Sequence, residues 1–357
     1  MSERGSTGEH SASEPDGRAS NPVMRALRVA VPDAVRRRLA LKFVVALLVM
    51  ALLIGLVGFV ATDRITTETE TRIQEEYRSL AVQEANLVGK QVEQARTATK
   101  LASRDAVWTS DNATLIRNEL RTVLSETSTA TTSVASIRVY EVEGGSYRTV
   151  ADTVGTNETL EDVRREWVAD ESFDDPTDVG VSSVYRTPAG PVMGVVSPVA
   201  GSDRYLLAEF SISTLAVQFQ GSDRAEGGFT QIVNGSGTVL IDEQEATAGV
   251  ASSEVLGAYG DETVLRRATG LTRNTSGVVA NRPASDVLNR SYVVGFAAVE
   301  ARGVDGEWYA LVHAPRAEVF GFANTVEEYG RLATGGAALL IVLVGAVWGA
   351  STSRSID

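Results

Sequence analysis

The chain has 357 residues, with 46 Asp plus Glu against 33 Lys plus Arg, two histidines and no cysteine. Disulfide scaffolds and cysteine zinc sites are therefore excluded, and a three-histidine metal site cannot be built. The formal net charge of −13 argues against a nucleic-acid partner, because neutralising phosphates requires a basic surface. Such an acidic, lysine-poor composition favours a salt-loving source, where counterions screen the repulsion between like charges.

Two apolar runs predict membrane spans. Residues 43–61 carry no charge over 19 positions and would cover about 28 Å as a helix, close to the hydrocarbon thickness of a bilayer. Residues 333–350 are also uncharged and are rich in Gly and Ala, a composition that suits close helix packing.

The flanks of the first span predict its orientation. Residues 1–42 begin as a polar, disordered leader and continue as a basic stretch, which places the N-terminus in the cytoplasm. The basic stretch also fits contact with anionic membrane lipid, although setting the topology explains it more simply. Residues 62–331 then lie outside the cell with 40 acidic and 24 basic residues. The tail, 351–357, returns to the cytoplasm, so we predict a two-pass protein of the plasma membrane.

Helical periodicity follows the first span. Apolar residues at intervals of three or four predict one long helix from Thr62 to about Trp108. A shorter helix is predicted from Ala113 to about Leu124, with Asp111 or Asn112 as its cap.

The period then changes to two, which predicts two sets of strands. The first set comprises residues 137–142, 147–153, 179–186, 192–198 and 205–212. The second set comprises residues 229–233, 238–242, 277–281, 292–299 and 308–313, and its first two strands flank an Asn-Gly hairpin signal. A short helix over 213–220 is predicted between the sets, and residues 315–349 are predicted to form a helix that runs into the second span.

Four segments, taken in order, carry a resemblance to a known family. They are VSSVYRTPAGPVMGVVSPV (181–199), LLAEFSIST (206–214), IVNGSGTVLID (232–242) and the stretch 291–320, which contains SYVVGFAAVE and GEWYALVHAPRAEVF. Over residues 62–322 the chain resembles the double Cache extracellular sensor domain of chemoreceptors and sensor kinases, most closely the sensor half of archaeal methyl-accepting transducers. The resemblance implies an α+β fold with two stacked PAS-like antiparallel sheets on a long N-terminal helix, flanked by two transmembrane helices.

This resemblance also implies a division of the chain. A leader (1–42) and the first span (43–61) precede a membrane-distal Cache subdomain that includes the long helix (62–220). A membrane-proximal Cache subdomain (221–322) follows, with a boundary in the Gly-containing stretch 221–228. A helix into the membrane (323–332), the second span (333–350) and a short tail (351–357) complete the chain.

The implied function is reception of a chemical signal. Such a receptor binds a small extracellular solute and shifts one membrane helix against the other, in chemotaxis-type signalling, as a homodimer or within a mixed receptor bundle. No enzymatic activity and no cofactor are expected. Because relatives continue into a HAMP linker and a signalling rod, we expect a truncated transducer or one that works through a partner. Two alternatives stay open: the sensor portion of a histidine kinase system, and a surface or assembly protein that retained the fold.

The resemblance also implies site residues in the membrane-distal subdomain. Amino-acid-binding members hold the ligand carboxylate with an Arg and a Trp two residues apart, which Arg165 and Trp167 match. They hold the ammonium with Tyr-x-Asp and a later acidic residue, for which this chain has Tyr185, Thr187 and Glu209. The ammonium clamp is therefore incomplete, whereas a carboxylate suits the guanidinium fork of Arg165 beside two aromatic walls.

Structural readings compete with these site assignments. Thr159 and Asp162 could form a capping box, which would place Trp167 on a buried helical face and point Arg165 away from it. The acidic run over 170–178 could bind Ca²⁺, but a solvated loop is the simpler interpretation in a chain this acidic. A catalytic triad through His313 is disfavoured, because this residue shares a strand face with apolar neighbours.

Overall fold

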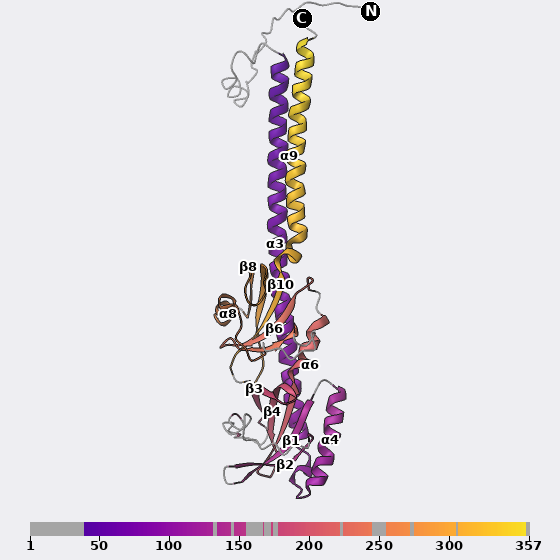
Figure 1. Ribbon diagram of the computed structural model, residues 1–357, viewed down its shortest axis with the longest axis vertical. Helices are drawn as coiled ribbons and strands as arrows, with labels where there is room; N and C mark the ends of the chain where they lie inside the picture. The colour runs from indigo at the N-terminus through magenta and orange to yellow at the C-terminus, as the bar shows by residue number, and fades with distance from the viewer. Residues whose placement is uncertain are drawn as a thin grey trace, which may run out of the picture. The chain divides into compact units, whose positions relative to one another are not determined.

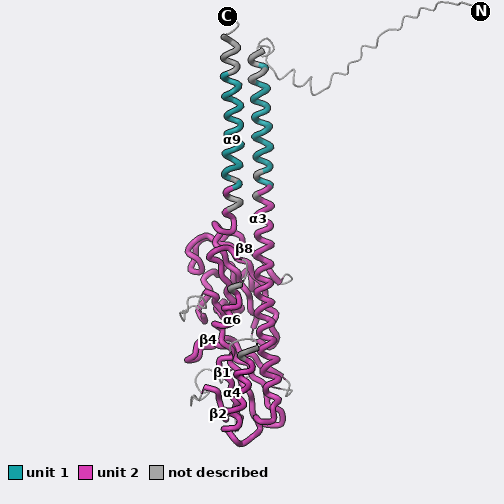
Figure 2. Tube along the Cα trace, turned by 90° about the vertical axis from the view of Figure 1, so that its right-hand side faces the viewer, with its two compact units in different colours: residues 1–64, 326–357 teal, residues 65–325 magenta. Residues whose placement is uncertain are grey.

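The structure, a computed structural model, describes residues 39–130, 134–143, 146–154, 167, 173, 178–221, 224–244, 255–271, 275–304 and 306–354. The chain separates into two compact units (Figure 2). Unit 1 comprises residues 1–64 and 326–357, and unit 2 comprises residues 65–325.

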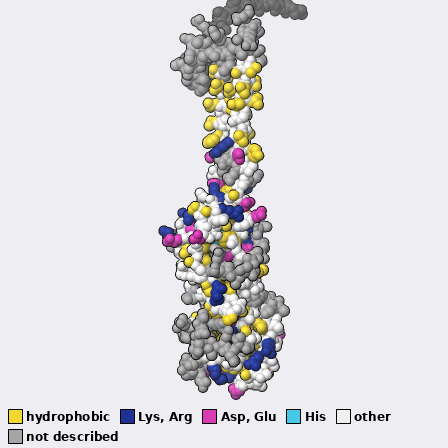
Figure 3. Space-filling view, in the orientation of Figure 1, with side chains coloured by type: hydrophobic (Ala, Val, Ile, Leu, Met, Phe, Trp, Pro, Cys, Tyr) yellow, Lys and Arg dark blue, Asp and Glu magenta, His cyan; other side chains and the backbone are white. Residues whose placement is uncertain are grey.

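Unit 1 is built from parts of two long helices, α3 (Leu39–Ala102) and α9 (Arg316–Arg354). Both contain a stretch long and apolar enough to cross a membrane, as the sequence predicted. Their apolar side chains are exposed, for example Val57 at 67% and Val347 at 69%, and Figure 3 shows these side chains gathered on the two helices. Exposed apolar surface of this extent suits a lipid environment rather than water.

Small residues bring these two helices close together. A Cβ added to Gly58 would lie 2.5 Å from Oγ1 of Thr334, and one added to Gly345 would lie 2.8 Å from Cδ1 of Leu47. Glycine at such positions lets two membrane helices approach without steric conflict.

Unit 2 holds two five-stranded antiparallel sheets (Figure 1). Sheet A has the order β2-β1-β5-β4-β3. Its strands are β1 (Val134–Glu143), β2 (Ser146–Asp152), β3 (Gly180–Thr187), β4 (Gly190–Pro198) and β5 (Arg204–Ser211). Sheet B has the order β7-β6-β10-β9-β8. Its strands are β6 (Phe229–Asn234), β7 (Val239–Asp242), β8 (Ser276–Arg282), β9 (Tyr292–Val299) and β10 (Trp308–Pro315). The two sheets repeat one topology, and each strand overlaps a predicted strand.

The long helix and the helix that follows it lie on one face of sheet A. The predicted long helix is confirmed as α3, which ends at Ala102 rather than near Trp108 and is followed by a short 3-10 helix, η1 (Ala106–Thr109). The second helix, α4 (Ala113–Ala130), packs on β1 and β2 and has its first turn capped by Asn112. It extends six residues past the predicted end at Leu124.

One hydrophobic core joins α3 to both sheets. It contains Ala81, Val88 and Val92 from α3 together with Val139 of sheet A and Ala310 of sheet B. The three-or-four-residue spacing of the helical members is the periodicity that predicted this helix. Because the core is continuous through both sheets, the division into two subdomains at residue 221 stays a prediction.

The short connecting helix predicted over 213–220 is confirmed as α6 (Ile212–Val217), which continues as a 3-10 helix, η2 (Gln218–Gly221). A further helix, α8 (Glu262–Thr269), was not predicted, although Asp261 caps it by accepting hydrogen bonds from two backbone N–H groups.

Candidate functional site

A polar cluster lies on the face of sheet A that points away from α3. Ile137 and Val139 belong to the core with α3, so the alternation along β1 puts Ser136 and Arg138 on the opposite face. Glu209 of β5 lies directly across from Ser136. All three polar residues are buried. Burial of an ion-forming side chain requires partners, which the neighbouring strands supply.

Side chains of the described residues around Glu209 hold its carboxylate. The Tyr185 hydroxyl donates a hydrogen bond to Oε1 over 2.8 Å. The Ser136 hydroxyl donates to Oε2, and Nη2 of Arg138 lies 3.7 Å from this same oxygen. The Arg138 and Glu209 side chains are 4% and 3% exposed, so their charges interact with little screening by water. We call Ser136, Arg138, Tyr185 and Glu209 the Glu209 cluster.

A second acidic residue lies on the neighbouring strand. Asp152 of β2 is directly opposite Arg138 in the β1–β2 register and is buried. Arg138 thus occupies a central strand with acidic residues on the strands to either side.

Aromatic rings stand beside the cluster. The rings of Trp167 and Tyr185 are 6.5 Å apart, tilted by 37°. Trp167 packs so closely on β4 that a Cβ added to Gly194, which pairs with Glu209, would lie 2.7 Å from its Cζ2. The indole Nε1 is buried and has no hydrogen-bond partner among the described residues. Because indole is a donor only, this group suits an acceptor atom of a ligand.

The structure brings together three of the five predicted site residues: Trp167, Tyr185 and Glu209. Thr187 has a local role instead, because its hydroxyl donates to the Gly190 carbonyl and accepts from the Ala189 N–H in the turn between β3 and β4. Arg165 lies outside the described residues, so its role stays a prediction.

Sequence reasoning missed two members of the cluster, Ser136 and Arg138. Their signal was the alternation Ser-Ile-Arg-Val-Tyr at the start of β1, which places an arginine among strand-forming residues. Such alternation normally indicates a half-solvated strand. Only the structure shows that both faces of β1 are covered.

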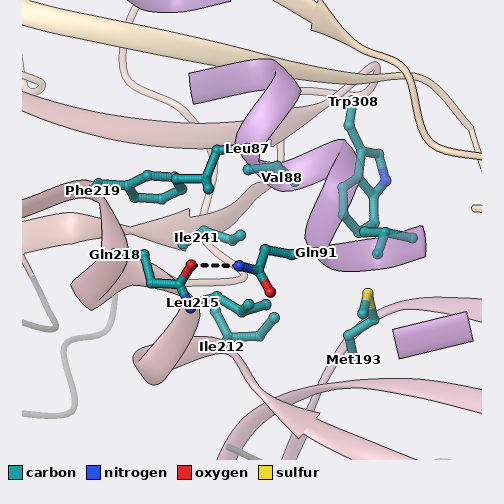
Figure 4. Close-up of a pocket in the computed structure, with 11 residues that line it drawn as sticks. Leu87, Val88, Gln91, Met193, Ile212, Leu215, Gln218, Phe219, Ile241 and Trp308 are labelled. Atoms are coloured by element: carbon teal, nitrogen blue, oxygen red, sulfur yellow. Dashed lines mark hydrogen bonds between the residues drawn. The ribbon is translucent and has the colours of Figure 1, made fainter. Parts of the chain in front are cut away.

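A small pocket lies between the two sheets, beside α3 (Figure 4). Apolar side chains such as Leu87, Phe219 and Trp308 line it, and Nε2 of Gln91 donates to Oε1 of Gln218 across it at 2.5 Å. Its cavity volume is about 10 Å³, which is room for a single water at most. This junction is a packed interface rather than a ligand pocket.

Sheet B carries its own buried polar network. His313 is fully buried, stacks on Phe229 with ring centroids 4.6 Å apart, and shares a 2.9 Å hydrogen bond with the Tyr259 hydroxyl. Burial lowers the pKa of His313 to about 3. The imidazole is therefore neutral at physiological pH, and among the described residues it has no carboxylate hydrogen-bond partner of the kind a catalytic triad requires.

Asp261, the acidic residue of this network, has its charge paired within the protein. Arg282 donates to both oxygens of Asp261, at 2.7 and 2.9 Å, and the Tyr292 hydroxyl donates to Oδ2 at 2.5 Å. Burial alone would raise the pKa of Asp261, but these hydrogen bonds outweigh it and lower that pKa. Burial and the bond to Asp261 raise the pKa of Tyr292 to about 12. Every charge here is paired, so we treat this network as structural.

Metal binding finds no support in the described part of the chain, where no group of three or more His, Asp or Glu side chains could hold an ion. The acidic run over 170–178, considered above for Ca²⁺, falls almost entirely outside the described residues.

Comparisons with known proteins agree with this architecture. No protein-family model matches the sequence. The chain is 29% identical over 305 residues to the transducer protein Htr18 of Halobacterium salinarum, which covers 85% of this chain and 34% of that protein. It is 25% identical over 334 residues to the transducer protein CosT of the same species, covering 90% of this chain and 40% of that protein. The chain thus spans roughly a third of the length of these curated relatives.

Among solved structures, the chain resembles the extracellular domain of a protein described as a histidine kinase, rpHK1S-Z16. The TM-score is 0.51 at 12% sequence identity, over 69% of this chain and 95% of that chain. The two proteins therefore share a fold. The resemblance stated from the sequence is therefore confirmed at the level of the fold, and the halobacterial relatives match the salt-loving source inferred from composition.

Proposed function

We propose that this chain is a two-pass membrane sensor that binds a small extracellular solute at the Glu209 cluster. The observation that carries the proposal is this buried, charged cluster on the face of sheet A that points away from α3. A buried ion pair contributes little to the stability of a fold, because apolar side chains of similar size often stabilise it equally well. The position of the Arg138–Glu209 pair beside aromatic rings therefore favours a role in ligand recognition. The names of both halobacterial relatives, which call them transducers, support the same role.

The proposal includes the route of the signal and the setting of the protein. Ligand binding shifts α3 against α9, in chemotaxis-type signalling, with residues 62–331 outside the cell and both termini inside. The chain works as a homodimer or within a mixed receptor bundle, with lipid around unit 1. Binding rather than catalysis is its activity.

Recognition of a carboxylate through Arg165 remains part of this proposal. A desolvated guanidinium holds a carboxylate by two parallel hydrogen bonds, and Trp167 and Tyr185 would supply the apolar walls. Arg165→Ala should then weaken ligand binding by about 2 kcal/mol and leave unliganded stability unchanged.

A solute screen by thermal unfolding tests the function. The full chain in detergent at high salt is melted with members of a library of small metabolites. A true ligand at a hundredfold excess over its dissociation constant adds about 2.7 kcal/mol to stability, whereas a protein that only retained the fold gains nothing. Absence of any stabilising solute would favour the surface or assembly role.

The sensor-kinase alternative is kept because the solved domain with the same fold is described as part of a histidine kinase. The two signalling roles share the binding step and differ only in the partner that reads the helix shift. Cross-linking of unit 1 to receptors or to kinases in native membranes separates them.

A further inference from the structure

We infer that the chain carries N-linked glycans on three asparagines of unit 2, Asn112, Asn234 and Asn289. The inference goes beyond the proposed function and depends on one part of it, the extracellular placement of residues 62–331. The co-reactant is an oligosaccharide joined through phosphate to a membrane lipid, brought by a transferase. The amide nitrogen bonds to the first sugar, the bond between that sugar and the phosphate breaks, and one amide proton leaves with the lipid phosphate.

The acceptor motif for this modification is frequent in the sequence. It consists of an asparagine, any residue except proline, and then Ser or Thr. The chain has ten asparagines and 62 Ser plus Thr among 357 residues, so about two motifs would arise by chance, whereas it has five. All five lie within residues 62–331, at Asn112, Asn157, Asn234, Asn274 and Asn289. Asn157 and Asn274 fall outside the described residues, so the structural argument uses the other three.

Asn112 turns its amide nitrogen toward solvent. This exposed residue caps α4, because its Oδ1 accepts hydrogen bonds from the backbone N–H groups of Thr114 and Leu115, at 3.0 and 3.2 Å. A backbone N–H can only donate, so these bonds fix the amide oxygen toward the helix and Nδ2 away from it. Thr114, which supplies the hydroxyl of the motif, is also exposed. A glycan on Nδ2 leaves Oδ1 in place, so the cap survives the modification.

Asn234 is held in the same way in the turn between β6 and β7. Its Oδ1 accepts from the N–H groups of Ser236 and Thr238, at 3.2 and 2.8 Å, and from the Ser236 hydroxyl at 2.7 Å. Ser236 is exposed and Asn234 is half-buried. Among the described residues, nothing accepts a hydrogen bond from Nδ2 of Asn234 or of Asn112. Both nitrogens are therefore free to carry a sugar without loss of a contact that the fold uses.

Asn289 lies in the loop between β8 and β9. Its whole motif is open to solvent, because Asn289, Arg290 and Ser291 are all exposed. A surface loop of an extracellular segment is the context in which this motif indicates glycosylation. Three separate places on unit 2 thus present an acceptor to solvent: the start of α4, one hairpin turn and one loop.

The glycans would also limit how unit 2 meets other proteins. An N-linked glycan is bulky and hydrated, so the surface around it cannot form a tightly packed interface. A homodimer or a receptor bundle must therefore use other surfaces of unit 2.

Mass spectrometry of the full chain tests the inference. The chain is expressed in a halophilic archaeon whose own surface proteins carry N-linked glycans, and those proteins serve as the positive control in the same membrane preparation. Peptides are fragmented to locate each modified residue. We expect sugar masses on Asn112, Asn234 and Asn289. Asn86 is exposed but lacks the hydroxyl two residues later, so its peptide should be unmodified.

Single substitutions separate glycan transfer from effects on folding. Asn112→Asp and Asn234→Asp keep a side-chain oxygen for the backbone donors, so each variant should fold and lose one glycan. Ser291→Ala should abolish the modification of Asn289, whereas Ser291→Thr retains the hydroxyl and should keep it. Asn86→Asp is the matched control and should leave the pattern of glycans unchanged.

Unmodified asparagines at all three positions, in a preparation whose surface proteins are glycosylated, overturn the inference. Modification confined to Asn157 and Asn274 also overturns it, because the exposed amides would then not be the acceptors. Labelling of Ser236→Cys by an impermeant thiol reagent in intact cells separates this failure from that of the proposed function. A reactive thiol leaves the extracellular orientation standing and removes only the glycans. An unreactive thiol that reacts after permeabilisation places unit 2 inside the cell, and both fail.

Discussion

Single residues of this protein show how burial changes the chemistry of a side chain. His313 is one of two histidines in the chain, and burial holds its pKa at about 3. In the unfolded chain the pKa of a histidine is about 6.5, so the unfolded state takes up a proton first as pH falls. The stability due to neutral His313 is complete above pH 6.5 and decreases as pH falls toward 3.

We therefore predict a pH-dependent loss of stability that belongs to His313. Between pH 6.5 and 5 the free energy of unfolding should fall by roughly 1.5 kcal/mol more in the wild type than in His313→Gln. Urea unfolding at high salt, repeated across this range, measures the difference. His10→Gln is the control and should follow the wild type. If the free energy of unfolding changes equally with pH in the wild type and in His313→Gln, the imidazole must be accessible to protons in the folded state.

A second residue, Gly194, controls the approach of Trp167 to the Glu209 cluster. A Cβ at this position would lie 2.7 Å from the indole and 2.9 Å from the Tyr185 hydroxyl. Gly194→Ala should therefore displace Trp167, reduce stability by about 1–3 kcal/mol and weaken ligand binding. Gly235→Ala, where the nearest atom is 3.8 Å away, should be neutral. Tryptophan fluorescence measures the displacement of Trp167, and the melting temperature measures the loss of stability. If Gly194→Ala binds ligand with wild-type affinity, Trp167 does not contribute to the binding site.

The same residues show what sequence can reveal about a site. Tyr185 and Glu209 were predicted because a resemblance carried them over, and the structure joins them by a hydrogen bond. Arg138 could not be predicted in this way, since its importance depends on burial of the face of β1 that looks polar in sequence. A local pattern shows which residues share a strand face, but only the tertiary fold shows what covers that face.

Elements were easier to predict than sites, because their signals are local. The strands alternate regularly and the core residues of α3 recur every three or four positions, so pattern alone located them. The helix α8 was not predicted because it has only eight residues, six of which lie outside the buried core. Its Asp261 cap and the Gly270 that follows its end were the signals available.

The contact between α3 and sheet B requires a glycine in β9. A Cβ added to Gly295 of β9 would lie 2.1 Å from the carbonyl oxygen of Tyr77, which is backbone and cannot rotate away. Gly295→Ala should force α3 off the sheet and destabilise the protein by about 3 kcal/mol or more. Gly321→Ala, a helix position with no atom within 4 Å, should instead stabilise slightly. Denaturant unfolding measures the free energy of unfolding of both variants. If Gly295→Ala is as stable as Gly321→Ala, α3 does not pack closely on β9.

At the scale of the whole molecule, charge is distributed unevenly along the chain. The segment before the first span is basic, whereas residues 62–331 hold 40 of the 46 acidic residues. Basic residues that flank a membrane span usually remain on the cytoplasmic side. This asymmetry therefore predicts a cytoplasmic N-terminus and an extracellular segment 62–331. An acidic sensor unit facing a saline exterior would also have its self-repulsion screened by salt.

The orientation can be tested with single cysteines, because the natural chain has none and therefore gives no background labelling. Ser236 is exposed in the turn between β6 and β7, whereas Ser6 belongs to the leader, outside the described residues. In intact cells a membrane-impermeant thiol reagent should label Ser236→Cys and leave Ser6→Cys unmodified. After permeabilisation both should react, which controls for accessibility of each thiol. If Ser6→Cys reacts in intact cells and Ser236→Cys does not, the sheets face the cytoplasm. The site could then sense only an internal solute, and the receptor would have to work in the opposite direction across the membrane.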